Sequence, residues 1–215
     1  MTEYIISHEN GAQYPVRNIY CVGRNYAGHA RELGNPLLSE PVFFQKALTC
    51  LTTADSIKLP SDRIIQHEIE LVILISKPGE GISADNSMDY MGGVALGLDL
   101  TDRKLQNELK DGKLPWFLSK SFKNSAVVSS FHELDLNNWS EKFWLKINGK
   151  VVQEGRMDDM EFDIPFLIEF LSSRIPLLAG DILFTGTPEG VGIVYKGNVL
   201  ELGLGASALK TIRIT

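Results

Sequence analysis

The chain has 215 residues, of which 44% are hydrophobic and 22% charged, and its formal net charge is −6. This length suffices for one domain with a sizeable core and hardly for two, so we expect a single domain over residues 1–215. The acidic balance without a basic patch argues against a nucleic-acid partner, and no apolar run is long enough to span a membrane. We see no signal peptide and expect a cytoplasmic protein.

Short strands joined by tight turns dominate the predicted elements. In chain order we predict strands at 3–7, 12–16 and 19–22, a helix at 26–33, strands at 68–75 and 94–98, a helix at 102–110, strands at 144–147 and 150–153, a helix at 162–173, and strands at 181–185 and 209–214. Asn10-Gly11 and Asn148-Gly149 tolerate positive φ and predict hairpins, the first within residues 1–16. Since β-α-β alternation is missing, we predict a β-rich α+β fold, a mixed β-sandwich or roll.

Local signals define some of these elements more closely. Thr101 is the expected N-cap of the helix at 102–110, and Gly112 suits its C′ position. Gly34 is expected to end the helix at 26–33. Cys21 and Cys50 lie in apolar surroundings, so we expect buried thiols rather than a disulfide or a metal pair.

Two glutamates precede the most apolar predicted strand. Glu68 and Glu70 are two residues apart, so within a strand they point to the same face, about 6–7 Å apart at the backbone. The continuous apolar run that follows predicts a strand covered on both faces. Two like charges beside it would be costly unless they share a cation. The alternative is a frayed, solvated strand start, which the pattern alone favours.

Asp99 makes a shared cation the better interpretation. A lone Asp at such a position is often only a capping or turn residue. Asp99 ends the glycine-rich apolar segment 92–98 and directly precedes a predicted helix. Three carboxylates at the ends of apolar strands supply the oxygen ligands that a hard cation prefers. We therefore predict that Glu68, Glu70 and Asp99 bind Mg²⁺ or Mn²⁺.

A second candidate site lies on the first predicted helix. His29 and Glu32 are three residues apart, so they face the same way on a helix and can hydrogen-bond. A carboxylate that orients an imidazole makes a competent general base for water. Gly28 within the segment and Gly34 after it suggest a lid. Such a pair on a surface helix is more often idle, so taken alone it leaves both interpretations open.

Seven motifs, in order and at compatible spacing, resemble the fumarylacetoacetate hydrolase family. They are Cys21-Val-Gly-Arg-Asn-Tyr26, His29-x-x-Glu32, Ser39-Glu-Pro-Val-Phe-Phe44, His67-Glu-Ile-Glu70, Leu98-Asp-Leu-Thr101, Leu118-Ser-Lys-Ser-Phe122 and Thr185-Gly-Thr-Pro-Glu-Gly-Val-Gly192. The likeness is to the short, single-domain acylpyruvase and oxaloacetate decarboxylase or tautomerase types. It runs from about residue 14 to residue 215.

The resemblance implies a β-rich roll of the family's C-terminal domain type, a homodimer, and Mg²⁺ or Mn²⁺ held by the three acids. His29 and Glu32 would be the catalytic dyad, and Lys120 the catalytic lysine. The substrate would face Arg24, Arg103, Gln106 and Thr187. Without the resemblance, Lys120 could simply snorkel to solvent.

Two positions depart from the family pattern. Ala47 follows Lys46 where relatives commonly have proline, and Gln66 stands where many have a second histidine. Neither position is a candidate metal ligand, so the departures bear on the surroundings of the site and on substrate choice.

The implied activity is metal-dependent hydrolysis of a carbon–carbon bond in acylpyruvates, that is 2,4-dioxo acids, with decarboxylation of oxaloacetate as a further reaction. The alternative is keto–enol tautomerisation of oxaloacetate, which needs only proton transfer. A third hypothesis is an inactive metal-binding paralogue.

Overall fold

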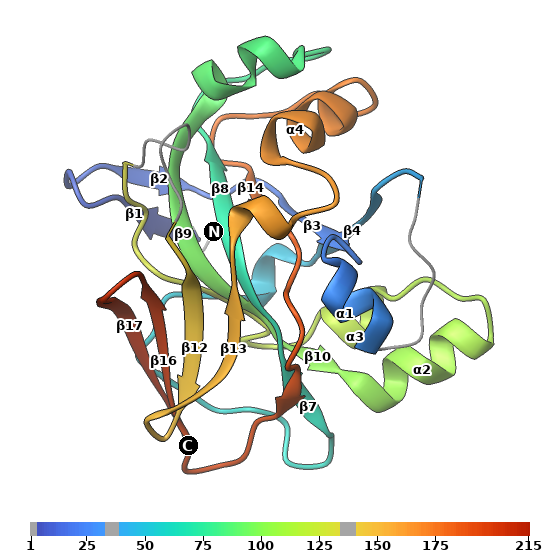
Figure 1. Ribbon diagram of the computed structural model, residues 1–215, viewed down its shortest axis with the longest axis vertical. Coiled ribbons are helices and arrows are strands. Elements are labelled where there is room, and N and C mark those ends of the chain that lie inside the picture. Colours follow the sequence, from blue (N-terminus) through green and yellow to red (C-terminus); the bar gives the residue numbers. More distant parts are fainter. Residues whose placement is uncertain (1–3, 33–38, 134–140) are drawn as a thin grey trace.

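A seven-stranded mixed sheet forms the centre of the structure, a computed structural model that describes residues 4–32, 39–133 and 141–215 (Figure 1). β14 pairs parallel with β3 and antiparallel with β8. In spatial order the strands are β4 (Val42–Lys46), β3 (Ile19–Gly23), β14 (Ile182–Phe184), β8 (Ile69–Ile75), β9 (Met91–Asp99), β11 (Ala126–Val128) and β5 (Leu51–Thr52).

A five-stranded sheet lies in front of the central one (Figure 1). Its strands are β13 (Lys150–Gly155), β12 (Phe143–Ile147), β16 (Val199–Leu204), β17 (Ser207–Ile214) and β6 (Ser56–Ile57). Asn148 and Gly149 join β12 to β13 with φ of 51° and 80°, the positive values of a two-residue hairpin turn. This hairpin was predicted correctly.

Two smaller sheets complete the strands. β1 (Ile5–Ser7) pairs with β2 (Gln13–Pro15), so the N-terminal hairpin forms with a longer connection than a two-residue turn. β7 (Ile65–His67) lies between β10 (Thr101–Asp102) and β15 (Gly192–Ile193). This three-stranded sheet was not predicted, because its strands are only two or three residues long.

The central strand β8 is buried on both faces, as its continuous apolar run predicted. Ile69, Leu71 and Ile73 belong to a core cluster that joins both large sheets and α4. Val72 and Leu74 belong to a second cluster on the opposite face. The fold is therefore β-rich with few helices, and the predicted fold class is confirmed.

Three helices gather beside one end of the central sheet (Figure 1). They are α1 (Ala27–Glu32), α2 (Arg103–Asp111) and α3 (Phe117–Lys120). Leu33 and Gly34, the expected end of the first helix, lie outside the described residues. α4 (Ile164–Ser172) packs beside the 3-10 helix Ala84–Tyr90, and further 3-10 turns span Leu48–Cys50 and Met157–Asp159.

The predicted caps of α2 were wrong. Asp102 is the N-cap, because its side chain accepts a hydrogen bond from the Leu105 N–H, whereas Thr101 pairs with Gln66 in β10. Gly112 has an ordinary φ of −77°, and the left-handed residue after this helix is Lys113. Local spacing allowed either cap, and the pairing of β10 with β7 decided between them.

Cys21 and Cys50 are buried free thiols, as expected. Across the described residues, none of the helices is long and apolar enough to traverse a bilayer.

Candidate functional site

Glu68, Glu70 and Asp99, here called the acid cluster, meet where β8 and β9 lie side by side. Asp99 ends β9, and its N–H donates to the Glu68 carbonyl at 2.9 Å. One carboxylate oxygen from each acid lies within 4.8 Å of the others. All three side chains are buried, so the solvated-strand alternative is wrong. Glu68 itself lies in the break between β7 and β8 rather than inside the predicted strand.

Three basic side chains surround the acid cluster. Lys120 Nζ donates to Glu68 Oε2 at 2.7 Å and to Asp99 Oδ2 at 2.6 Å, and it is 2% exposed rather than snorkelling. Arg103 forms a short ion pair with Glu68. Lys46 Nζ lies 2.6 Å from Asp99 Oδ1, with both side chains wholly buried. This contact is a charge pair without hydrogen-bond geometry, since Asp99 Oδ1 has no hydrogen-bond partner.

The acids differ in how their charge is balanced. Burial opposes ionisation of Glu68, but Lys120 and Arg103 outweigh it and hold its pKa well below the usual range. For Glu70, burial and the neighbouring Asp99 and Glu68 carboxylates raise the pKa well above the usual range. Glu70 accepts a 2.7 Å hydrogen bond from the Gly186 N–H, and no ion pair to it occurs among the described residues. Glu70 is thus the acid of the cluster without a basic partner among the described residues.

The donor set fits a divalent cation. Carboxylate oxygens are the ligands of Mg²⁺ and Mn²⁺, and a shared cation would supply the positive charge that Glu70 lacks. Opposite ligands of Mg²⁺ are about 4.2 Å apart. Because the oxygens already lie within 4.8 Å, only small movements of side chains are needed.

His29 and Glu32 are brought together beside the acid cluster. His29 Nδ1 lies 3.4 Å from Glu32 Oε2, longer than an ideal hydrogen bond, and the Gly190 N–H reaches both Glu32 oxygens at 3.2 Å. His29 is buried, and burial lowers its pKa below 6.5, so the imidazole is neutral at pH 7. Packing explains the glycine at position 28, because a Cβ there would lie 1.9 Å from Glu189 Oε2.

The candidate substrate residues line one cleft of about 390 Å³, measured with its open mouth. The side chains that line it are those of Val22, Arg24, His29, Phe44, Glu68, Glu70, Arg103, Gln106, Lys110, Trp116, Lys120 and Thr187, together with Gly23. All the candidate catalytic and substrate-facing residues except Glu32 are in this set, and Glu32 contacts it through His29.

Arg103 is fixed by three protein oxygens. Its Nε donates to Gln66 at 2.6 Å, and its two terminal nitrogens donate to Gln106 and Glu68. Because arginine has no acceptor, the Gln106 atom that faces it is the amide oxygen. The Gln106 NH₂ group is therefore the part left to donate into the cleft.

The hydroxyl of Thr187 is engaged inside the protein. It donates to the Ile69 carbonyl at 2.8 Å and accepts from Gln153 Nε2 at 2.9 Å. Gln153 also accepts from His67 Nδ1 at 2.7 Å. A hydroxyl has one proton, so the Thr187 side chain has no donor left for a substrate.

Sequence reasoning missed four polar residues of this region. Lys46 pairs with Asp99 of the acid cluster, and Gln153 donates a hydrogen bond to Thr187. Gln66 accepts a hydrogen bond from Arg103, and Lys110 lines the cleft. In the sequence, Gln66 stood out only as a departure from the family pattern, and Lys46 only as the residue before another departure, Ala47. A lysine at the buried end of an apolar strand was the available signal for Lys46.

Comparison with known proteins gives a consistent result over nearly the whole chain. The model of the family described as fumarylacetoacetate (FAA) hydrolase C-terminal matches residues 18–212. The human protein named oxaloacetate tautomerase FAHD1, mitochondrial, is 43% identical over 202 residues, which cover 92% of this chain and 91% of that protein. A Dictyostelium discoideum protein named oxaloacetate decarboxylase, mitochondrial, is 42% identical over 195 residues, which cover 87% of this chain and 88% of that protein.

A solved structure is similar throughout. The fumarylpyruvate hydrolase of Pseudomonas aeruginosa, in complex with Mn²⁺ and pyruvate, has a TM-score of 0.93 and 30% sequence identity. The match covers 100% of this chain and 97% of that one.

Proposed function

The chain belongs to the fumarylacetoacetate hydrolase family, and we propose that it is a divalent-cation-dependent enzyme that interconverts the keto and enol forms of oxaloacetate. The observation that carries the proposal is one cleft in which Glu68 and Glu70 of the buried acid cluster lie with a neutral His29 and a charged Lys120. Relatives at 42–43% identity that are named for reactions of oxaloacetate support the choice of substrate.

Glu68, Glu70 and Asp99 would hold the cation, Mg²⁺ or Mn²⁺. When bound, the cation supplies a Lewis acid that polarises the 2-oxo group and stabilises negative charge on its oxygen. Lys120 and Arg103 keep Glu68 ionised for this role. The Mn²⁺ in the similar Pseudomonas structure supports the choice of metal class.

His29 is the group we assign to proton transfer. Its Nδ1 faces Glu32, so Nδ1 carries the proton and Nε2 is left as the acceptor. In our scheme Nε2 takes a proton from C3 of the keto form and returns it to the C2 oxygen, which gives the enol. Burial of Lys120 opposes its charge, but Asp99 and Glu68 outweigh burial and raise its pKa, so Lys120 stays a cationic donor. The Gln106 NH₂ group is a second donor for developing negative charge.

Hydrolysis of acylpyruvates, the first expectation from the sequence, is the second candidate. The paired His29 and Glu32 favour it, because an oriented neutral imidazole can remove a proton from water as well as from carbon. The similarity to fumarylpyruvate hydrolase also supports it. In that reaction Lys120 and Gln106 would stabilise the oxyanion formed when water attacks the distal carbonyl. The complete set of charged groups argues against an inactive paralogue.

One experiment separates the two reactions. Purified protein with Mg²⁺ is offered enol-oxaloacetate and acetylpyruvate, while enol absorbance and pyruvate release are followed separately. We expect accelerated loss of the enol without matching pyruvate. Pyruvate from acetylpyruvate at a comparable rate would make the hydrolase the principal activity, and no reaction with either substrate would refute both.

Three further properties stay predictions: the single catalytic domain over residues 1–215, the homodimer and the cytoplasmic location. Several relatives are named as mitochondrial proteins, so location needs its own measurement.

A further inference from the structure

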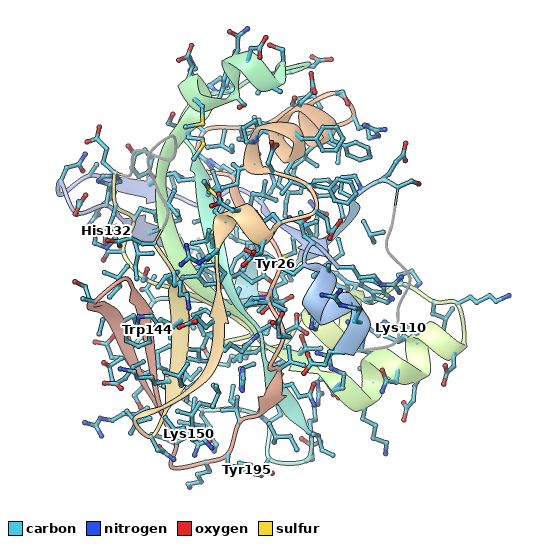
Figure 2. All side chains as sticks on the ribbon, viewed as in Figure 1. Tyr26, Lys110, His132, Trp144, Lys150 and Tyr195 are labelled. Carbon is cyan, nitrogen blue, oxygen red and sulfur yellow. The ribbon has the colours of Figure 1, made fainter. Side chains whose placement is uncertain are left out.

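The cleft has a second group of charges, on side chains less buried than those of the acid cluster. Lys110 Nζ lies 5.2 Å from the centroid of the Trp116 ring, and the Arg24 guanidinium carbon lies 5.9 Å from the same centroid. All three side chains line the cleft, and we call them the mouth cluster. Figure 2 shows Lys110 on the side of the molecule where α1, α2 and α3 gather.

The two cations of the mouth cluster lack anionic partners. Among the described residues, neither the Lys110 ammonium nor the Arg24 guanidinium has a hydrogen bond or an ion pair, and the Arg24 Nε is buried without a partner. Arg103 and Lys120, further in, are by contrast satisfied by protein oxygens. Burial and the nearby Arg103 and Arg24 lower the pKa of Lys110 to about 8. Positive charge is therefore concentrated here without a paired acid among the described residues.

The backbone is shaped to keep Arg24 in place. Its φ of 62° is a left-handed conformation that costs a residue with a side chain free energy, and such conformations collect at functional sites. The preceding Gly23 lets Trp116 approach, because a Cβ there would lie 3.1 Å from the ring. Stacking on Trp116 holds both cations without using their hydrogen-bond donors.

We propose that the mouth cluster binds a second, distal carboxylate of the substrate, and that the enzyme therefore selects 2-oxo acids with two carboxylates over those with an uncharged tail. The inference rests on the proposed function, in which the acid cluster and its cation hold the 2-oxo acid end. A chain that runs outward from that end meets Lys110 and Arg24, whose free donors suit a carboxylate. Oxaloacetate has such a second carboxylate and acetylpyruvate does not.

The test uses stable ligands of equal length. Protein loaded with Mg²⁺ is titrated calorimetrically with 2-oxoglutarate and with 2-oxopentanoate, which has a methyl group in place of the distal carboxylate. Oxalate, which has no tail, reports on the inner end alone. We expect 2-oxoglutarate to bind at least about 10-fold more tightly than 2-oxopentanoate, the factor expected of one charge-assisted hydrogen bond.

Variants of Lys110 locate the effect. Lys110→Met should lower the ratio of the two affinities several-fold and leave oxalate binding unchanged, because Arg24 remains. Lys110→Glu should weaken the binding of 2-oxoglutarate further. Lys104→Met is the matched control, because Lys104 lies on the same helix, is exposed and does not line the cleft. With oxaloacetate as substrate, Lys110→Met should raise KM and leave kcat nearly unchanged, since the contact is made in ground and transition states alike.

The outcomes separate this inference from the proposed function. If oxalate binds but wild type holds both oxo acids equally, or Lys110→Met and Lys110→Glu keep the wild-type ratio, the mouth cluster has no such role and the proposed function stands. If oxalate does not bind in the presence of Mg²⁺, both are refuted. Circular dichroism of each variant verifies that the loss is not one of folding.

Discussion

Lys46 provides a direct test of how the buried charges support the fold. Its ammonium lies 2.6 Å from Asp99 Oδ1, and it also donates to the backbone carbonyls of Leu100 and Lys120. Lys46→Met keeps an unbranched apolar side chain, one atom shorter, but removes the charge. It leaves Asp99 in place, wholly buried and with one ion pair fewer.

The expected loss is large. Removing one partner of a buried ion pair costs about 3–5 kcal/mol, because the remaining charge stays desolvated. In a chain of this size, 1 kcal/mol shifts Tm by about 2–4 °C. Without a divalent cation, Lys46→Met should therefore melt about 6–20 °C below wild type. Saturating Mg²⁺ should raise the Tm of the variant by more than that of wild type, because the cation replaces the missing positive charge beside Asp99.

Differential scanning calorimetry in EDTA and in Mg²⁺ measures both effects. The control is Lys142→Met, which removes an ion pair to Glu154 whose two side chains are 45% and 44% exposed. Exposed pairs contribute about 0.2–1 kcal/mol, so this variant should lose no more than about 4 °C. A Lys46→Met protein that melts within 2 °C of its Lys142→Met counterpart in EDTA would refute the reasoning.

Three further predictions concern the cleft. His29→Ala should lower kcat about 10²–10⁴-fold with unchanged Mg²⁺ affinity. Because burial lowers the pKa of His29 and its protonated form cannot accept a proton, wild-type activity should fall only as the pH drops below 6.5. A loss of activity that begins above pH 6.5 on acidification would contradict this. Mg²⁺ affinity should rise with pH, because burial and the neighbouring carboxylates raise the pKa of Glu70 and its proton must leave before it binds the cation; calorimetric titrations that give the same affinity at every pH would contradict this. Gln66→Met removes the acceptor of Arg103 Nε and should lower kcat/KM about 10-fold or more, whereas Gln66→Glu keeps an oxygen there; equal kcat/KM in the Met variant and wild type would count against this role.

Local periodicity was enough to find the central strand, because its continuous apolar run predicts burial on both faces. The spacing of Glu68 and Glu70 alone favoured a solvated strand start, and Asp99 at the end of a second apolar strand was needed to predict a shared cation. Asn148-Gly149 likewise predicts its hairpin, because positive φ is a property of those two residues. Features of this kind depend on neighbours within a few positions.

The partners of the acids depend on topology instead. Lys46 is 53 positions before Asp99 in the sequence, and the pairing of β4 with β3 at the sheet edge places it there. Lys120 lies on a four-residue helix, too short to leave a periodic signal. Gln153 looks like an ordinary outward residue of a hairpin strand, yet it is 1% exposed because β13 crosses the loop of Thr187.

The charge balance gives a reason to bury basic side chains beside a proposed metal site. When every group is ionised, the three negative charges of the acid cluster equal the three positive charges of Lys46, Lys120 and Arg103, so the inner end of the cleft has no net charge once Glu70 has lost its proton. A divalent cation then leaves this end with two positive charges, which attract the carboxylate and the 2-oxo oxygen of a substrate. Without the basic residues, the same cation would leave one negative charge and repel that anion. The lysines and the arginine would thus lower the affinity for the proposed metal and raise the affinity of the loaded site for the acid, and neutralising any one of them should shift both affinities in opposite directions.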